Sequence, residues 1–297
     1  MRSTQSPYLR RADFLTTTES PSSNDGVTEP SEPTEQWTPE RYEQFQSERE
    51  RPANDLYALL TPTPGGQAVD LGCGTGPLTT RLAEITGAAD VVGIDSSAAM
   101  LEAARGHARP GVRFEAGDLA TWGDPTAPVD VVAANASLQW VPDHVEVLTR
   151  WTAALRPGGQ LAVQVPSNAD HASHLMAAEV AAEAQFAGAF AAAGGPPPDP
   201  VATNVLKPEA YAELLWDLGY ADQIVRLQVY GPVLPSTAGV VDWMAGTSLT
   251  RFERLLDDAT YTAFVDRYRG RLVEELGDHR PYYFAFKRIV MWGQRPA

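Results

Sequence analysis

Five short apolar runs, each separated from the next by polar or helical sequence, constrain the fold of this chain more than any other feature. The runs are QAVDLG (67–72), DVVGID (90–95), VRFEAGD (112–118), VDVVAANA (129–136) and GQLAVQVP (159–166). Helical patterns follow or precede them at 77–86, 97–106 and 143–155. Strands that are apolar almost throughout are buried on both faces, and their alternation with helices is typical of a parallel sheet covered by helices on each side.

The rest of the chain adds strands at one edge of this sheet and helices outside it. Residues 207–220 predict a helix, 221–234 a sixth strand, and 282–294 a last strand that we expect to run antiparallel. The expected fold class is α/β, a doubly wound, seven-stranded and mostly parallel sheet. Two segments, about 167–206 and about 237–276, interrupt the alternation and predict helical insertions that form a lid.

The first 36 residues differ in composition from everything that follows. They are rich in Ser, Thr, Pro and Glu, and such a segment buries too little apolar surface to offset its chain entropy, so we predict disorder for 1–36 and a single domain over 37–297. Thr38 and Pro39 are typical of a helix start. There is no apolar run of membrane-spanning length and no apolar stretch at the amino terminus, which predicts a cytoplasmic protein.

Charge and cysteine content argue against several classes of partner. The formal net charge is −15, which disfavours nucleic acid, because phosphate binding requires a basic face. The single cysteine, Cys73, cannot form an internal disulfide, and the five histidines show no metal-ligand spacing, so we expect no bound metal. We expect no membrane partner and a monomer or weak homodimer.

The stretch VDLGCGTG, residues 69–76, lies where the first predicted strand turns into a helix. Glycines there let the backbone approach a ligand closely and present free N–H groups at the helix start. A dinucleotide site requires G-x-G-x-x-G, but Pro77 stands where the third glycine belongs. The motif therefore disfavours NAD.

An acidic residue followed by G-x-G-x-G resembles the S-adenosylmethionine site of class I methyltransferases, which have a Rossmann-like fold. The resemblance implies that Asp95 binds the ribose hydroxyls, that Asp118 and Leu119 hold the adenine, and that Asn135 lies beside the methionine portion. The full cofactor set that it implies is Asp70, Gly72, Cys73, Gly74, Gly76, Asp95, Ser96, Asp118, Leu119, Asn135 and Tyr42. Taken singly, Gly74 could merely shape a turn, and Asp95 or Asp118 could cap a helix.

A narrower resemblance covers about residues 37–294. The stretches WTPERYEQFQSERERPANDL, GIDSSAAML, NASLQWVPDH, LAVQVPSN and FAFKR are similar to those of the trans-aconitate 2-methyltransferase family. It implies transfer of a methyl group from S-adenosylmethionine to one carboxylate of trans-aconitate, giving a monomethyl ester. Residues 171–206 depart from the family pattern, which leaves the identity of the acid open.

Methylation of a carboxylate places few demands on catalytic groups. A carboxylate has a pKa of about 4 and is already ionised at neutral pH, so no general base is required and we expect no catalytic dyad. The remaining carboxylates must be received by cations or hydrogen-bond donors. We expect substrate contacts from Arg51, Ser137, Gln139, Trp140, His144, His174, Tyr283 and Arg288, with Arg49 and Tyr282 as further candidates. Within this set, Gln139 is expected to donate to the acid and Trp140 to exclude water.

Each of these residues also has a plain structural interpretation. The arginines could form surface ion pairs, Tyr42 could pack on Phe45, and His144 could belong to a helix start. Trp216 and Trp243 are assigned to core packing, and Cys73 is expected to point out of the glycine turn without a reactive role.

The alternative functions are a carboxyl methyltransferase for another dicarboxylic or carrier-bound acid and a small-molecule methyltransferase of secondary metabolism. A further alternative, outside enzymes, is a catalytically silent module that binds the cofactor.

Overall fold

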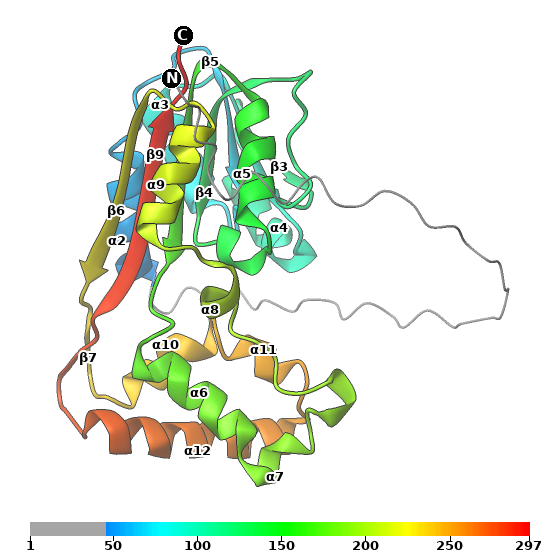
Figure 1. The fold of residues 1–297 in the computed structure, drawn as a ribbon. Helices are drawn as coiled ribbons and strands as arrows, with labels where there is room; N and C mark the ends of the chain where they lie inside the picture. The colour runs from blue at the N-terminus through cyan, green and yellow to red at the C-terminus, as the bar shows by residue number, and fades with distance from the viewer. Residues whose placement is uncertain (1–45) are drawn as a thin grey trace, which may run out of the picture. The chain divides into compact units, whose positions relative to one another are not determined.

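The computed structural model describes residues 46–297, shown as a ribbon in Figure 1. Tyr42 and the segment predicted to be disordered, 1–36, lie outside the described residues. So does the boundary expected between residues 36 and 37, and the side chain of Arg49 is not described. The statements below concern the described part of the chain.

A seven-stranded sheet forms the centre of the fold, in the order β3-β2-β1-β4-β5-β9-β6 (Figure 1). Strands β1 to β5 pair in parallel, whereas β9 runs antiparallel to both β5 and β6. The strands are β1 (Gln67–Leu71), β2 (Asp90–Asp95), β3 (Val112–Ala116), β4 (Val129–Asn135), β5 (Leu155–Pro166), β6 (Asp222–Tyr230) and β9 (Phe286–Gln294). The predicted fold class, including the antiparallel last strand, is confirmed.

Helices cover both faces of this sheet. The helices beside it are α2 (Gln46–Tyr57), α3 (Pro77–Thr86), α4 (Ala98–Ala104), α5 (His144–Ala153) and α9 (Pro208–Asp217). Leu56 of α2 and Leu82 of α3 pack with Ala133 on one face, and Trp151 of α5 and Leu214 of α9 belong to the core on the other. Burial on both faces is the reason why the central strands are apolar almost throughout.

A second group of helices forms a layer of its own at the end of the sheet where β4 and β5 finish (Figure 1). We call residues 167–206 and 237–276 the lid. It contains α6 (Ala172–Ala182), α7 (Ala184–Ala187), α8 (Pro200–Asn204), α10 (Gly239–Ala245), α11 (Thr250–Glu253) and α12 (Asp258–Leu276). Its own core includes Phe186, Phe252 and Phe264, and each buried aromatic ring of this kind contributes about 1.5–3 kcal/mol to stability. The helices of the lid thus pack around a hydrophobic core of their own.

The last two predicted strands are each broken in two. β6 ends at Tyr230, and a short strand β7 (Val233–Leu234) pairs instead with β8 (Tyr282–Tyr283). Pro232 lies between β6 and β7, and it has no N–H to donate to a sheet. The break lets both chain segments leave the sheet and enter the lid.

One packing prediction was wrong and one was right. Trp216 lies on the outer side of α9 with 70% of its surface exposed, so it is not a core residue. Trp243, on α10 of the lid, is 4% exposed and packs on Phe284 and on Phe286, the first residue of β9.

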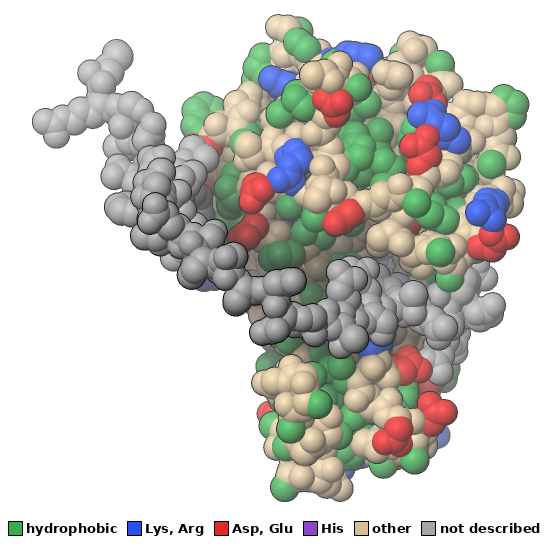
Figure 2. Space-filling model, turned by 90° about the vertical axis from the view of Figure 1, so that its right-hand side faces the viewer, with side chains coloured by type: hydrophobic (Ala, Val, Ile, Leu, Met, Phe, Trp, Pro, Cys, Tyr) green, Lys and Arg blue, Asp and Glu red, His purple; other side chains and the backbone are tan. Residues whose placement is uncertain are grey.

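Surface charges of opposite sign lie next to each other. On the face in Figure 2, Lys and Arg side chains lie beside Asp and Glu side chains rather than forming a basic patch. Arg109 pairs with Glu84 and Arg113 with Asp90, both at exposed positions, where such pairs contribute little to stability. Among the described residues, no helix is long and apolar enough to cross a membrane.

Candidate active site

The glycine motif forms a tight loop between β1 and α3. Gly72, Gly74 and Gly76 all have positive φ angles, a region that favours glycine. A Cβ atom at Gly72 would lie 2.2 Å from the Cβ of Ser137, whereas a Cβ at Gly74 would meet no atom within 4 Å. The loop is therefore packed against the segment that follows β4 on one side and is open on the other. Such a loop leaves room for a ligand to approach its backbone N–H groups.

Asp95 connects the end of β2 to this loop. Its carboxylate accepts hydrogen bonds from the backbone N–H of Gly74 at 2.9 Å and of Ser97 at 2.8 Å. Ser97 also caps α4 by accepting from the N–H of Met100. The carboxylate is thus held at the mouth of the loop, with Ser96 exposed beside it.

Asp70 lies beneath the loop rather than in its mouth. Its side chain is 2% exposed and accepts a hydrogen bond from the Thr79 hydroxyl at 2.6 Å. Burial raises its pKa to about 6, a shift that the Thr79 hydrogen bond opposes and the nearby charge of Asp95 increases. Asp70 therefore supports the loop from below.

Replacing Asp70 with asparagine should stabilise the protein at pH 7.5 but not at pH 4. The folded-state pKa of about 6 lies above the usual 3.8, so the unfolding free energy of the wild type falls as pH rises through that window. The shift corresponds to about 3 kcal/mol. Urea unfolding at the two pH values measures the difference. If the unfolding free energies of the asparagine variant and the wild type differed by the same amount at pH 4 and at pH 7.5, ionisation of Asp70 would not destabilise the folded protein.

The other expected cofactor residues surround the same loop. Leu119, which follows β3, would lie 3.5 Å from a Cβ at Gly72, and Asp118 is exposed and accepts from the N–H of Ala120. Cys73 is 6% exposed and turns inward over Gly93, so the prediction that it points out of the turn was wrong. Burial also raises the pKa of its thiol, which keeps it protonated and unreactive.

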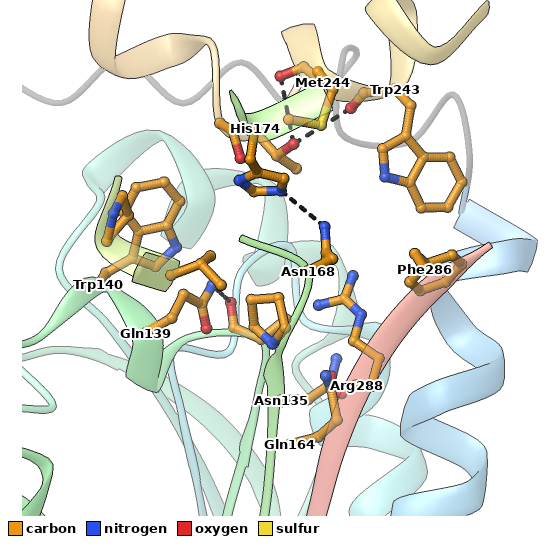
Figure 3. Close-up of a pocket in the computed structure, with 16 residues that line it drawn as sticks. Asn135, Gln139, Trp140, Gln164, Asn168, His174, Trp243, Met244, Phe286 and Arg288 are labelled. Atoms are coloured by element: carbon orange, nitrogen blue, oxygen red, sulfur yellow. Dashed lines mark hydrogen bonds between the residues drawn. The ribbon is translucent and has the colours of Figure 1, made fainter. Parts of the chain in front are cut away.

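A cavity opens at the carboxyl ends of β4 and β5, between the sheet and the lid (Figure 3). Its empty volume is about 780 Å³, part of it open to solvent. Five predicted site residues line it: Asn135, Gln139, Trp140, His174 and Arg288.

The register of the sheet explains why polar side chains meet at the cavity floor. Asn135 is paired with Gln164 across β4 and β5, and Pro166 is paired with Arg288 across β5 and β9. Side chains two residues apart on a strand share a face, so Asn135, Gln164 and Arg288 project from the same face at the carboxyl ends of the strands. Figure 3 shows their side chains grouped in this way.

Several buried polar atoms around this cavity have no protein hydrogen-bond partner. They include Asn135 Oδ1, Gln139 Oε1, Gln164 Nε2 and Asn168 Oδ1. Leaving a polar group buried without a partner costs about 1–3 kcal/mol. Unpartnered buried groups that converge on one cavity are the feature expected of a site for a polar ligand.

The stretch NASLQW turns sharply at the cavity wall. Ala136 has a φ of 53°, which is uncommon for a residue other than glycine. Its carbonyl accepts from Gln139 Nε2 at 2.6 Å, which uses one of the two N–H groups of that amide. The amide oxygen of Gln139 is buried without a protein partner. The expected role of Gln139 toward the acid stays a prediction.

The lid contributes a hydrogen-bonded chain to the opposite wall. His174 Nε2 lies 2.8 Å from Asn168 Nδ2, and His174 Nδ1 lies 2.5 Å from Asp199 Oδ2. Arg251, 8% exposed, lies 4.0 Å from the same Asp199 oxygen. The lid is also tied to NASLQW, since Asn204 of α8 donates to the carbonyl of Gln139 at 3.0 Å.

Three predicted substrate residues lie elsewhere. Ser137 donates its hydroxyl to the carbonyl of Leu71 at 2.6 Å and packs under Gly72, so it shapes the loop. Both ring nitrogens of His144 are within hydrogen-bond distance of protein atoms, Tyr211 Oη and the Leu138 carbonyl, and burial lowers its pKa. Tyr283 is 61% exposed in the short β7–β8 pair. None of these three residues lines the cavity.

Arg51 and Tyr282 are not part of the cavity lining either. Arg51 is exposed on α2, and Tyr282 is half-buried where β8 meets the lid. Among the described residues, no group of His, Cys, Asp or Glu could hold a metal ion.

Three residues at the cavity were not predicted from the sequence. Gln164 and Asn168 line it, and Asp199 contacts His174, which also lines it. Gln164 interrupts the apolar run LAVQVP, and a polar residue in a strand buried on both faces is a signal that could have marked it. Asp199 follows three prolines and is 25 residues from His174, so no local pattern connects the two.

Comparison with known proteins agrees with this geometry. A family model described as "Methyltransferase domain" matches residues 68–159. The chain is 44% identical over 264 residues to the trans-aconitate 2-methyltransferase of Deinococcus radiodurans, an alignment that covers 88% of this chain and 98% of that protein. It is 39% identical over 268 residues to the protein of the same name from Variovorax paradoxus, covering 88% and 99%.

Solved structures show the same fold at much lower identity. The YcgJ protein of Bacillus subtilis is similar with a TM-score of 0.54 and 11% identity, covering 84% of this chain and 99% of that one. A putative methyltransferase from Bacillus halodurans has a TM-score of 0.52 and 14% identity, covering 82% and 99%.

Proposed function

Because the chain belongs to the trans-aconitate 2-methyltransferase family, we propose that it methylates one carboxylate of trans-aconitate with S-adenosylmethionine. The observation that carries the proposal is the cavity between the sheet and the lid, which is lined by Arg288 and by side chains with unpartnered buried polar atoms. The product is a monomethyl ester.

The glycine loop and its neighbours fit the cofactor. Gly74 has open space above it, Asp95 stands at the loop mouth, and Leu119 lies against Gly72. When bound, S-adenosylmethionine supplies an electrophilic methyl group on a positively charged sulfur. Asn135 and Gln139 line the cavity, and their buried oxygens, which have no protein partner, are suited to a positively charged ligand.

The far side of the cavity fits an anion. Gln164 Nε2 is a buried donor, and the guanidinium of Arg288 lies over the Phe286 ring at 5.0 Å from its centroid. Arginine binds a carboxylate through two parallel hydrogen bonds. We propose that Arg288 and Gln164 receive carboxylates that do not react, so that the acid is held with one carboxylate toward the glycine loop.

Catalysis then depends on position and on exclusion of water. The reacting carboxylate is ionised at neutral pH, so the chain has no proton to remove. Trp140, Trp243 and Met244 line the cavity from the wall and the lid. A dry cavity favours a reaction in which a negative oxygen and a positive sulfur neutralise each other.

Incubation with methyl-labelled S-adenosylmethionine and a panel of acids tests the proposal. We expect a base-labile labelled ester with trans-aconitate, and none with cis-aconitate, citrate, isocitrate or malonyl carrier protein. Label on the carrier protein or another acid would instead support the corresponding alternative. Cofactor binding without any transfer would indicate a catalytically silent module.

Four further assignments are part of the proposal. We propose that residues 37–297 form the catalytic domain, with the insertions of the lid at about 167–206 and 237–276. We also propose that the substrate is a small anionic acid rather than a macromolecule, that the protein acts as a monomer or weak homodimer, and that it works in the cytoplasm. Light scattering during size-exclusion chromatography measures the oligomeric state.

A further inference from the structure

The guanidinium of Arg288 lies against an aromatic ring in the wall of the cavity. Its Cζ atom is 5.0 Å from the centroid of the Phe286 ring, over the face of that ring. A cation within about 6 Å of a ring centroid is attracted by the electron density of the face. Both residues line the cavity, and Figure 3 shows the two side chains near each other on β9. The cation proposed to bind the acid therefore has an aromatic neighbour in its own strand.

The pairing of the strands explains why these two side chains meet. Phe286 and Arg288 are two residues apart on β9, so they project from the same face of the sheet. Across β6, Phe286 is paired with Tyr230 and Arg288 with Gln228. The regular geometry of the strand is thus enough to place the ring beside the arginine.

The position of the Phe286 ring is fixed by three other elements. Tyr230 of β6 stacks on it with a centroid separation of 5.5 Å and an interplanar angle of 26°. The Tyr230 hydroxyl in turn donates to Asp55 of α2 at 2.7 Å. From the lid, Trp243 of α10 packs on the Phe286 ring at 5.2 Å. Phe286 is 1% exposed, and a close-packed ring of this kind has little freedom to move.

A fixed ring under the guanidinium matters because arginine has a long and flexible side chain. A ligand that binds such a side chain must order it, and the entropy that is lost opposes binding. A guanidinium that already lies on a fixed ring has less freedom left to lose when a carboxylate binds it. The ring can therefore raise the affinity for the acid without touching the acid.

We propose that Phe286 is a positioning residue, whose ring holds the Arg288 guanidinium in the orientation that receives a carboxylate of the acid. The ring acts through Arg288 and makes no bond to the acid. Its contribution lies in the affinity for the acid, and binding of the cofactor and the transfer step do not depend on it. This inference rests on the proposed function for the role of Arg288 and for the identity of the acid.

Fluorination of the Phe286 ring tests this role, because it changes the charge of the face with little change in size. Fluorine withdraws electrons from the face, so mono-, tri- and pentafluorophenylalanine at position 286 weaken the attraction for a cation step by step. We expect the KM for trans-aconitate to rise along this series and to reach about fivefold with the pentafluoro ring, which corresponds to about 1 kcal/mol. The kcat and the KM for S-adenosylmethionine should stay within twofold. A KM for the acid that does not change along the series would overturn the proposal.

Phe284 supplies the matched control for packing. It is 1% exposed, as Phe286 is, and its ring also packs on Trp243, but it does not line the cavity. The same fluorinated rings at position 284 should leave the KM for the acid within twofold. An equal rise at positions 284 and 286 would show an effect of packing and would overturn the assignment.

The variant Arg288→Met separates an effect through the arginine from a direct effect of the ring on the acid. If the ring acts only through the guanidinium, the pentafluoro ring at position 286 should change the KM for the acid by less than twofold in that variant. A fivefold rise in this background as well would show that the ring acts without Arg288, and the positioning role would be wrong.

Nitrogen-15 relaxation of the Arg288 side chain gives a readout that needs no turnover. Its Nε–H signal is identified in the full chain by its absence from Arg288→Met. Without the acid, we expect the order parameter of this group to fall when the pentafluoro ring is at position 286 but not when it is at position 284. An order parameter that is the same with either ring would overturn the proposal. If it falls as expected but the wild type transfers no methyl group to trans-aconitate, the positioning of Arg288 is supported and only the proposed function is contradicted.

Discussion

Replacing Arg288 with methionine should raise the KM for trans-aconitate about 100-fold, which corresponds to about 3 kcal/mol of lost binding free energy. Arg288 is the charged side chain that projects from β9 onto the cavity floor, next to Gln164 and Asn168 (Figure 3). The guanidinium of Arg288 lies over the Phe286 ring, and the thioether of methionine can contact an aromatic ring in its place, so the change removes mainly the charge and its hydrogen-bond donors. Steady-state kinetics with each substrate varied in turn measure the effect.

The neighbouring residue supplies the control for this experiment. Lys287→Met removes the same charge from the same strand, but Lys287 pairs with Asp170 at the surface. We expect that variant to keep its KM for the acid within about twofold, because exposed ion pairs contribute little. A KM for the acid that is unchanged in Arg288→Met would remove Arg288 from the substrate site.

In the proposed complex, one cavity has to hold a cationic cofactor and an anionic acid. Asn135 lies at the end of β4, which is next to β1 and its glycine loop, whereas Gln164 and Arg288 lie on β5 and β9. The order of the strands therefore places Arg288 farther from the loop than Asn135.

The sequence predicted the sheet and the glycine loop because both depend on local patterns. Strands such as Val129–Asn135 are apolar because they are buried on two faces, and a glycine such as Gly72 is required where φ is positive and Ser137 is in contact. Both constraints can be recognised in a few consecutive residues of the sequence. The same reasoning identified Asn135 as the polar residue at the end of a buried strand.

The part of the cavity proposed to bind the acid could not be predicted in this way, because it is assembled from residues far apart in the chain. Asp199 and His174 meet only after the lid folds, and Gln164 meets Arg288 only through the register of an antiparallel pair. His144 and Tyr283 are the opposite case, because they were predicted to bind the acid but do not line the cavity. Each has the right chemistry near a promising motif, yet His144 is used inside the fold and Tyr283 faces solvent.

Replacing Asp95 with alanine should weaken binding of S-adenosylmethionine about 100-fold while changing the KM for the acid much less. The carboxylate stands at the mouth of the glycine loop, where it accepts the N–H of Gly74 and of Ser97. In the proposed complex it also accepts from the ribose hydroxyls, and hydrogen bonds to a charged group contribute about 1.5–3 kcal/mol. Calorimetric titration with S-adenosylhomocysteine measures the loss without turnover.

A second substitution separates binding from loop structure. Asp95→Asn keeps one oxygen that can accept from Ser97 or Gly74 but carries no charge, so its unfolding free energy should stay closer to that of the wild type than that of Asp95→Ala. If Asp95 binds the ribose, both variants lose affinity although only the alanine variant loses appreciable stability. If affinity follows stability across the two variants, Asp95 acts only by holding the loop, and the cofactor must be bound by the backbone of Gly72 to Gly76 and by Asp118 and Leu119.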